Sequence, residues 1–203
     1  MTQASFAFLL AIVGFSSAQV FRPGPCPDVQ PVDDFDVHRY AGRWYEIARF
    51  FNSAESGLKC QSQYYTVEDG YLLSKETGLG AHGQEGYSYE SKMYNPTFDW
   101  KIGILYYAWP HRNKVIFRIP LVNYDRYSVN IICQEYFQGF ANIEYAWVIA
   151  RNRTMSEEDY SDIMRRLNSM GIDVKEFIMA DQTNCPNYHD DNDDEDGRSL
   201  TPK

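Results

Sequence analysis

The sequence has little histidine and cysteine, and after its first residues it has no long apolar run. Its 203 residues include four histidines and four cysteines. No two cysteines form a C-x-x-C pair, which argues against zinc and thioredoxin-like sites. The histidines are scattered along the chain, so no Ser-His-Asp or metal-binding cluster is visible. We therefore predict no catalytic residues and no metal ligands. Since every later apolar run is soon interrupted by charge, we also expect no stable membrane insertion.

The N-terminus lacks Lys and Arg but carries a mostly apolar run over residues 6–15. This run is too short to span a bilayer, and small residues follow it at 16–18, where a signal peptidase would cut. We therefore predict a secretory signal peptide over 1–18 and an extracellular location. No internal repeat or linker divides the remainder, which is long enough for one domain with its own core over 19–188.

The four cysteines, Cys26, Cys60, Cys133 and Cys185, are an even number in a secretory context. Two structural disulfides are the expected use of such a set, and their spacing leaves all three pairings open.

The formal net charge is −9, and part of it is concentrated at the C-terminus. Residues 189–203 hold six acidic side chains against Arg198 and Lys203, with almost nothing apolar to bury. We predict that 189–203 is a disordered acidic tail that favours solubility. The acidic balance argues against nucleic acid and anionic membrane surfaces as partners.

Alternating aromatic and apolar residues predict a chain made mostly of strands. Turn residues separate the segments, and the order of short neighbouring strands favours an up-and-down barrel or a sandwich. An eight-stranded barrel has an interior just wide enough for one small ligand. The predicted strands begin at Trp44 and continue at 61–67, 71–75, 87–94, 100–106, 114–121, 127–133 and 143–150.

One amphipathic helix is predicted after the last of these strands. Ser156 is a good N-cap, and Gly171 is a good residue to follow the C-terminus. Tyr160, Ile163 and Leu167 recur at helical spacing and mark the face that packs. Residues 172–179 then begin a final short strand.

Two short motifs carry a resemblance to the lipocalin family. They are Gly42-Arg43-Trp44-Tyr45-Glu46 at the first strand and Ala146-Trp147-Val148-Ile149-Ala150-Arg151-Asn152 at the last. A partial second motif lies at Val122-Asn123-Tyr124-Asp125. Together with Cys26-Pro27, Phe35-Asp36 and Asp181-Gln182-Thr183-Asn184-Cys185-Pro186, these are similar to the branch of apolipoprotein D and the insect bilin-binding proteins.

The resemblance implies an all-β fold: an eight-stranded antiparallel up-and-down barrel with one C-terminal α-helix packed outside. It also implies disulfides Cys26–Cys133 and Cys60–Cys185, which would leave no free thiol for the cysteine chemistry of the few enzymatic lipocalins. In such a protein Gly42, Trp44 and Arg151 are structural. Trp44 would lie inside the closed end of the barrel with Arg151 over its ring.

Strand alternation then predicts which side chains face the interior. Glu46 and Ala48 share the parity of Trp44, and Glu46 would either have a raised pKa or pair with a nearby base. For each predicted interior residue, core packing is an alternative to ligand contact. The candidate ligand-binding residues are Gln63, Tyr65, Tyr87, Tyr89, Trp100, Ile102, Ile104, Phe117, Ile119, Tyr145 and Trp147.

Two types of ligand fit such an aromatic cavity, and no cofactor is required. The segment 27–36 is similar to the insect bilin binders and favours a bilin such as biliverdin, with His82, His111 and Arg112 near its propionates. A fatty acid, sterol or retinoid is the alternative. A third hypothesis is a lipocalin with a filled barrel that recognises partners through its surface. Asn152 begins an N-x-T sequence and is a candidate glycosylation site. The sequence does not define an oligomeric state.

Overall fold

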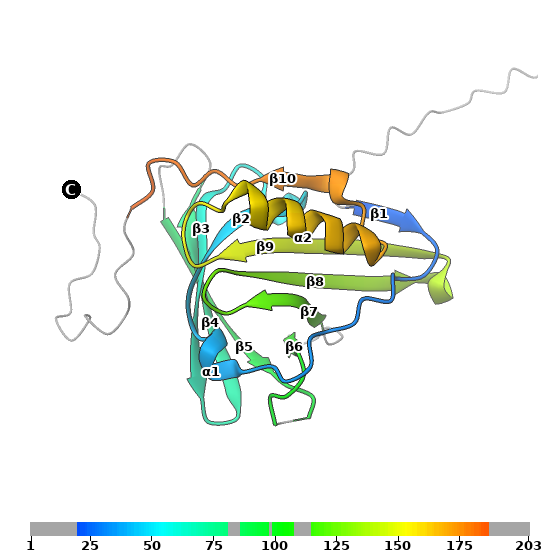
Figure 1. Cartoon of the computed structure of the whole chain (residues 1–203), viewed down its shortest axis with the longest axis horizontal. Helices are drawn as coiled ribbons and strands as arrows, with labels where there is room; N and C mark the ends of the chain where they lie inside the picture. Colours follow the sequence, from blue (N-terminus) through cyan, green and yellow to red (C-terminus); the bar gives the residue numbers. More distant parts are fainter. Residues whose placement is uncertain (1–19, 81–85, 98, 108–114, 187–203) are drawn as a thin grey trace, which may run out of the picture.

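The computed structural model describes residues 20–80, 86–97, 99–107 and 115–186, and these form one antiparallel sheet. Eight strands, β2 to β9, pair in sequence order, and β9 also pairs with β2 to close the ring (Figure 1). The predicted fold is confirmed. The strands are β1 (Val20–Pro23), β2 (Gly42–Phe50), β3 (Lys59–Glu68), β4 (Tyr71–Leu79), β5 (Gly86–Tyr94), β6 (Ile104–Tyr107), β7 (Val115–Asn123), β8 (Tyr127–Tyr136), β9 (Ala141–Ala150) and β10 (Phe177–Met179).

Two strands outside the ring extend the sheet at two different places, β1 on the side of β9 that faces β2 and β10 on the side of β2 that faces β3. β1 pairs with the beginning of β9, and β10 pairs with the end of β2. The short α1 (Val37–Tyr40) precedes β2, and α2 (Glu157–Ser169) follows β9. Three 3-10 turns, η1 (Ser53–Glu55), η3 (Phe137–Gly139) and η4 (Val174–Glu176), complete the described elements. Within the part of the chain that the structure describes, no helix has both the length and the apolar character needed to span a membrane.

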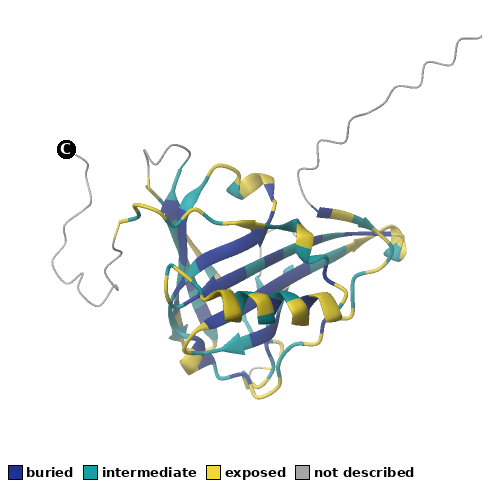
Figure 2. Cartoon of the chain, turned by 45° about the horizontal axis from the view of Figure 1, so that its top comes forward, coloured by how far each residue is buried: buried dark blue, intermediate teal, exposed yellow. Residues whose placement is uncertain are grey.

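Helix α2 lies on the outside of the barrel, as predicted. Ser156 is its N-cap, with its hydroxyl accepting from the Asp159 amide at 3.1 Å. Ile163 and Leu167 are fully buried against the outer faces of β2, β8 and β9. Figure 2 shows the exposed outer face of the helix, with buried strands behind it. The barrel wall at this point therefore has apolar residues on both faces.

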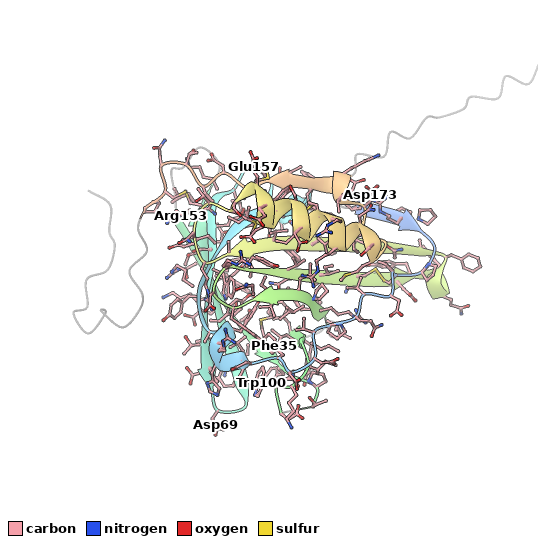
Figure 3. The ribbon with its side chains drawn as sticks, viewed as in Figure 1. Phe35, Asp69, Trp100, Arg153, Glu157 and Asp173 are labelled. Atoms are coloured by element: carbon pink, nitrogen blue, oxygen red, sulfur yellow. A yellow bond between two sulfur atoms is a disulfide. The ribbon has the colours of Figure 1, made fainter. Side chains whose placement is uncertain are left out.

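A second apolar cluster, which we call the interior cluster, fills one end of the barrel. Trp44 lies at its centre with no exposed surface, and its indole Nε1 donates to the Tyr40 carbonyl at 2.7 Å. The guanidinium of Arg151 lies 3.7 Å from the centroid of the Trp44 ring. Phe35 and Trp100 add to the same end (Figure 3). This end of the barrel is closed by packed aromatic side chains.

Gly42 is required where β2 enters this closed end. Its φ of +89° is a conformation that residues with a Cβ rarely adopt, and a Cβ there would lie 3.4 Å from Arg151 Nη1.

Asn152 is exposed in the bend after β9, so its glycosylation stays a prediction.

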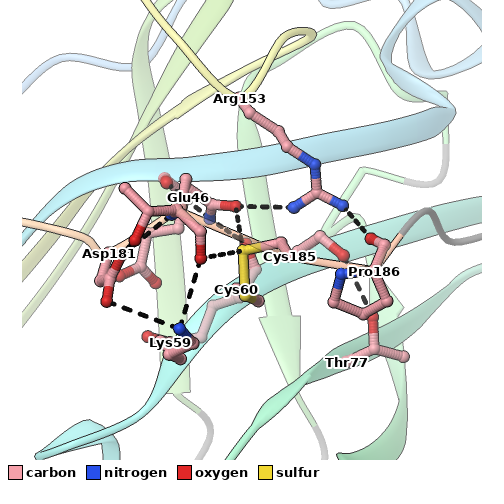
Figure 4. The surroundings of a disulfide bond; sticks show 12 residues. Glu46, Lys59, Cys60, Thr77, Arg153, Asp181, Cys185 and Pro186 are labelled. Carbon is pink, nitrogen blue, oxygen red and sulfur yellow. Dashed lines mark hydrogen bonds and ion pairs between the residues drawn. A yellow bond between two sulfur atoms is a disulfide. The ribbon is translucent and has the colours of Figure 1, made fainter. Parts of the chain in front are cut away.

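Two disulfides use all four cysteines, in the pairing that the resemblance implies. Cys26–Cys133 attaches the N-terminal coil to β8, and Cys60–Cys185 attaches the C-terminal segment to β3. Around the second disulfide, Arg153 donates to the side chain of Gln182, whose amide donates to the backbone carbonyl of Glu46 (Figure 4). The C-terminal segment is thus anchored to the barrel by covalent and polar contacts.

Two predictions about the strands were wrong. Residues 100–103 do not belong to β6, because the N-terminal coil crosses there: the Gly103 amide donates to the Val32 carbonyl at 2.9 Å. Trp100 adopts a positive φ of 56°, outside the extended region. In β2, the register against β9 shifts between Glu46 and Ala48. This bulge moves Ala48 into the cluster beneath α2 instead of the interior.

Candidate functional site

The barrel contains a cavity of about 660 Å³, and Tyr65, Phe117 and Ile132 of the interior cluster form part of its wall. Its lining includes Asn52, just after β2 ends, and Tyr136, the last residue of β8. Both positions lie at the opposite end of the ring from Trp44, so the cavity lies toward the end that Trp44 and Arg151 leave open. Tyr89 and Tyr136 are 49% and 40% exposed, which places them where the cavity meets solvent.

The structure brings six of the predicted ligand-binding residues together around this cavity. They are Gln63, Tyr65, Tyr89, Phe117, Tyr145 and Trp147. Whether they contact a ligand stays a prediction. The lining also includes residues that the sequence did not indicate: Asn52, Ala54, Glu55, Glu76, Tyr107, Val115, Asn130, Ile132, Gln134 and Tyr136.

The other five predicted residues do not line the cavity. Ile119 and Trp100 pack in or against the interior cluster at the closed end. Ile102 forms an isolated bridge with Asp33, and Ile104 is half-buried and belongs to neither apolar cluster. Because Leu105 and Tyr107 belong to the interior cluster, the alternation of β6 is the reverse of the predicted one. Tyr87 contacts the carboxyl group of Glu76 instead.

One wall of the cavity is a series of aromatic rings. Tyr145 and Trp147 have ring centroids 6.1 Å apart and planes only 6° apart. Trp147 is also stacked with Phe117 at 5.9 Å, and Phe117 meets Tyr107 edge to face at 4.8 Å. These rings come from β6, β7 and β9, and offer a flat apolar surface to a ligand.

Carboxyl groups lie beside this aromatic wall, because β2 pairs with β9 and Arg49 is the cross-strand partner of Trp147. The β2 bulge lets both Glu46 and Arg49 point inward, and Arg49 Nη1 donates to Glu46 Oε1 at 2.7 Å. Arg49 also contacts Glu55, with Nε 3.2 Å from the carboxylate and Nη2 donating to the backbone carbonyl at 2.8 Å. The Glu55 carboxylate accepts from Trp147 Nε1 at 3.2 Å. Glu55 therefore links the acidic side of the cavity to its aromatic wall.

Glu46 was predicted either to have a raised pKa or to pair with a nearby base, and the structure contains both features. Glu46 pairs with a base, Arg49, and is completely buried. Burial and the charge of Glu55 nevertheless raise its pKa, and Arg49 offsets this only in part.

Glu76 on β4 is a further carboxyl group on the cavity wall. The Tyr87 hydroxyl donates to Glu76 Oε1 at 3.2 Å, and the Tyr87 ring covers Gly78, where a Cβ would lie 2.7 Å from the ring. Burial, together with the charge of Glu55, raises the pKa of Glu76 to about 7, while the Tyr87 hydrogen bond opposes the shift. Tyr87 thus acts on the site through Glu76.

The alternation of side chains along the strands did not predict that Glu76 and Arg49 point into the barrel, and the reason can be identified for each. Glu76 shares the parity of Ser74 in a strand that mixes polar and apolar residues on both faces, so alternation does not mark its interior side. Arg49 has the wrong parity relative to Trp44 until the bulge is known. The cross-strand pairing of Gln63 with Glu76 would have found Glu76 once the register was fixed.

A smaller hollow of about 390 Å³ lies on the outside of the barrel, between α2 and the segment around β10. Met155, Tyr160 and Met179 contribute to its lining. The interior cavity is larger and is enclosed by rings from several strands, so we take it as the candidate site.

The chain belongs to the lipocalin family: the family model described as a lipocalin-like domain matches residues 35–182. Among curated proteins, it is similar to apolipoprotein D of Macaca fascicularis, with 30% identity over 184 residues, covering 89% of this chain and 94% of that protein. It is also similar to the bilin-binding protein of Pieris brassicae, with 29% identity over 180 residues, covering 87% of this chain and 94% of that one.

Solved structures agree on the fold. Insecticyanin of the tobacco hornworm Manduca sexta matches with a TM-score of 0.69 and 23% identity, covering 80% of this chain and 89% of that structure. Lobster apocrustacyanin A1 matches with a TM-score of 0.61 and 19% identity, covering 77% and 92%.

Proposed function

We propose that this protein is a secreted carrier that holds one small lipophilic ligand in the interior cavity. The observation that carries the proposal is the cavity of about 660 Å³, which side chains leave unfilled inside a closed ring of strands. Its volume lies in the range of small-molecule sites, and its walls combine apolar rings with a few polar groups. The family relationship supports the same class of function.

A bilin such as biliverdin is the ligand that we favour. The near-parallel rings of Tyr145 and Trp147, continued by Phe117, offer a flat surface suited to a planar conjugated molecule. Similarity to a bilin-binding protein supports this choice. His82, His111 and Arg112, which we predicted near the propionates, lie outside the described residues.

A fatty acid, sterol or retinoid is the second candidate, supported by the equally strong similarity to apolipoprotein D. The surface-recognition hypothesis required a filled barrel, and the unfilled cavity argues against it. A carrier is also favoured over an enzyme, because both disulfides together use every cysteine of the chain. The signal peptide over 1–18 and the acidic tail over 189–203 lie outside the described residues and remain part of the proposal.

The test combines spectroscopy with a pair of variants on neighbouring residues of β7. A visible absorption band in protein purified from its source would identify a bilin, and titration with biliverdin, retinol and oleate would compare the candidates. Val115→Trp fills the cavity, whereas Ile116→Trp adds the same ring at a residue that is 40% exposed and does not line the cavity. We expect Val115→Trp to weaken binding by about tenfold or more and Ile116→Trp to leave it unchanged. Equal affinity for both variants would place the ligand elsewhere.

A further inference from the structure

The charged side chains that line the cavity all carry the same sign. Among its described lining residues these are Glu55 and Glu76, and none is Lys, Arg or His. An anionic group buried against these walls would face two carboxyl groups without a cation of its own. A buried charge without a partner is costly, so the walls discriminate by charge as well as by shape.

Arg49, which contacts the lining residue Glu55, is already engaged. Arg49 contacts Glu46 at 2.7 Å and Glu55 at 3.2 Å, and donates to the Glu55 carbonyl at 2.8 Å. Its side chain is 6% exposed, so no open guanidinium surface faces the cavity. Arg49 therefore holds Glu46 and Glu55 in place and is poorly placed to receive a ligand carboxylate.

Two buried acceptors in or beside the site lack a hydrogen-bond donor among the described residues. Glu46 is fully buried, and its Oε2 has no hydrogen-bond partner among the described residues. The side-chain oxygen of Gln63, on the cavity wall, also has none. Gln63 is the cross-strand partner of Glu76, so this amide oxygen and the Glu76 carboxyl group lie side by side. Buried acceptors without donors point to a ligand that supplies N–H groups.

We propose that the cavity selects ligands whose buried end carries a positively charged nitrogen on an apolar, preferably planar, body. This inference rests on the proposed carrier function and narrows its substrate class. The nitrogen donates to the Glu76 carboxylate and the Gln63 amide oxygen, while the aromatic wall of Phe117, Tyr145 and Trp147 packs on the body. A bilin satisfies this rule when its ring nitrogens carry the extra proton, and a fatty acid does not.

Binding of such a cation depends on pH through Glu76, whose pKa is raised to about 7. Below this pH Glu76 is neutral and gives the cation less attraction, so affinity falls as the pH is lowered from 8 to 5.5. A bound cation favours the ionised carboxylate, and binding near neutral pH therefore releases protons. The titratable groups that interact with Glu76 from the surrounding elements are Glu46, Glu55, Tyr65, Tyr87 and Tyr107, and Tyr89 is its cross-strand partner on β5. Arg49 pairs with Glu46 and Glu55 and offsets part of their charge.

The test uses three probes with one aromatic body and different head groups: pyrenemethylamine, pyrenemethanol and pyreneacetic acid. Energy transfer from tryptophan to pyrene reports binding at pH 8. We expect the amine to bind about tenfold more tightly than the alcohol, the scale of one charge-assisted hydrogen bond, and the acid to bind more weakly than the alcohol. The advantage of the amine should shrink at pH 5.5.

Glu76→Gln keeps the shape of the side chain and an acceptor for Tyr87 but removes the charge. We expect it to remove most of the amine's advantage and its pH dependence while lowering the affinity for the alcohol much less. Retained alcohol binding also shows that the variant is folded. Glu68→Gln, at an exposed position near the end of β3, makes the same change in net charge and should have no effect.

Each negative result has a distinct meaning. If the acid binds as tightly as the amine, or if Glu76→Gln and Glu68→Gln behave alike, the inference about charge is wrong and the carrier function stands. If none of the three probes binds while biliverdin, retinol or oleate does, the inference is wrong and the carrier function stands; if none of these six compounds binds, the proposed function itself fails.

Discussion

Glu76 lowers the free energy of unfolding at alkaline pH, because its carboxyl group must ionise inside the barrel. Its pKa of about 7 in the folded protein lies above the ordinary value of 4.5. Between these two pH values the folded state keeps a proton that the unfolded chain has released. The free energy of unfolding contributed by this group is therefore fully present below about pH 4.5 and is lost as the pH rises toward 7.

Glu76→Gln should consequently stabilise the protein at alkaline pH. We expect a gain of about 2 kcal/mol in the free energy of unfolding at pH 8 and almost none at pH 4. Urea unfolding at both pH values measures the difference. The exposed Glu68→Gln variant should show no such dependence on pH, and a Glu76→Gln gain equal at pH 4 and pH 8 would contradict a raised pKa.

The sequence predicted the residues of the site correctly where side chains alternate regularly between the two faces of a strand. It placed Tyr65, Phe117, Tyr145 and Trp147 in the interior, because their strands keep their period through the centre of the barrel. It failed at Ala48, where the bulge in β2 reverses the alternation, and at Ile104. Such bulges depend on pairing with distant strands, which a local pattern does not contain.

The closed end joins several elements through one side chain. Arg151, just after β9, donates to the backbone carbonyls of Arg39 at 2.7 Å, Arg43 at 2.9 Å and Tyr124 at 2.9 Å. It thereby ties together α1, the beginning of β2 and the turn between β7 and β8, and it covers the Trp44 ring. Arg151 therefore holds three segments of the chain around the packed aromatic side chains that close the barrel.

Arg151→Ala should lower stability without altering the cavity. We expect a loss of about 2–4 kcal/mol, from the charged hydrogen bonds and the ring contact together. Urea unfolding gives the loss, and ligand titration well below the unfolding midpoint should give an unchanged affinity. Arg165→Ala, on the exposed face of α2 with its side chain 78% exposed, should cost almost nothing. A stable Arg151→Ala variant with weakened binding would instead place Arg151 in the ligand site.

At the level of elements, most of the fold followed from the sequence. The predicted helix and the strands other than β6 appear with ends shifted by a few residues, because turn residues and caps are local signals. Neither α1 nor β1 was predicted. β1 has only four residues and is held by pairing with β9, a contact that no local pattern reveals. β6 is shortened for a similar reason, since Gly103 pairs with the distant Val32.

On the scale of the whole molecule, the disulfides attach both ends of the described chain to the barrel. Cys60–Cys185 joins residues separated by 125 positions, and Cys26–Cys133 joins residues separated by 107. Bonds that close such long loops remove many conformations from the unfolded chain, so both should contribute to stability.

Replacing Cys60 and Cys185 together by serine should lower the free energy of unfolding by about 2–5 kcal/mol. Chemical denaturation of the double variant and of the wild type measures the loss. The reduced wild type, which also lacks Cys26–Cys133, should be less stable than the variant. Unchanged stability would mean that the polar contacts of Gln182 and Arg153 alone hold the C-terminal segment.

The two short strands outside the ring have a consequence for association between copies of the chain. β1 pairs with β9 beyond the residues that pair with β2, and β10 pairs with β2 beyond the residues that pair with β3. The described sheet therefore ends in edge strands of four and three residues, the first of which contains Pro23. Short edges, and a proline that lacks an N–H, give another molecule little backbone on which to add a strand. At these two ends the described sheet thus offers little edge for strand-by-strand association.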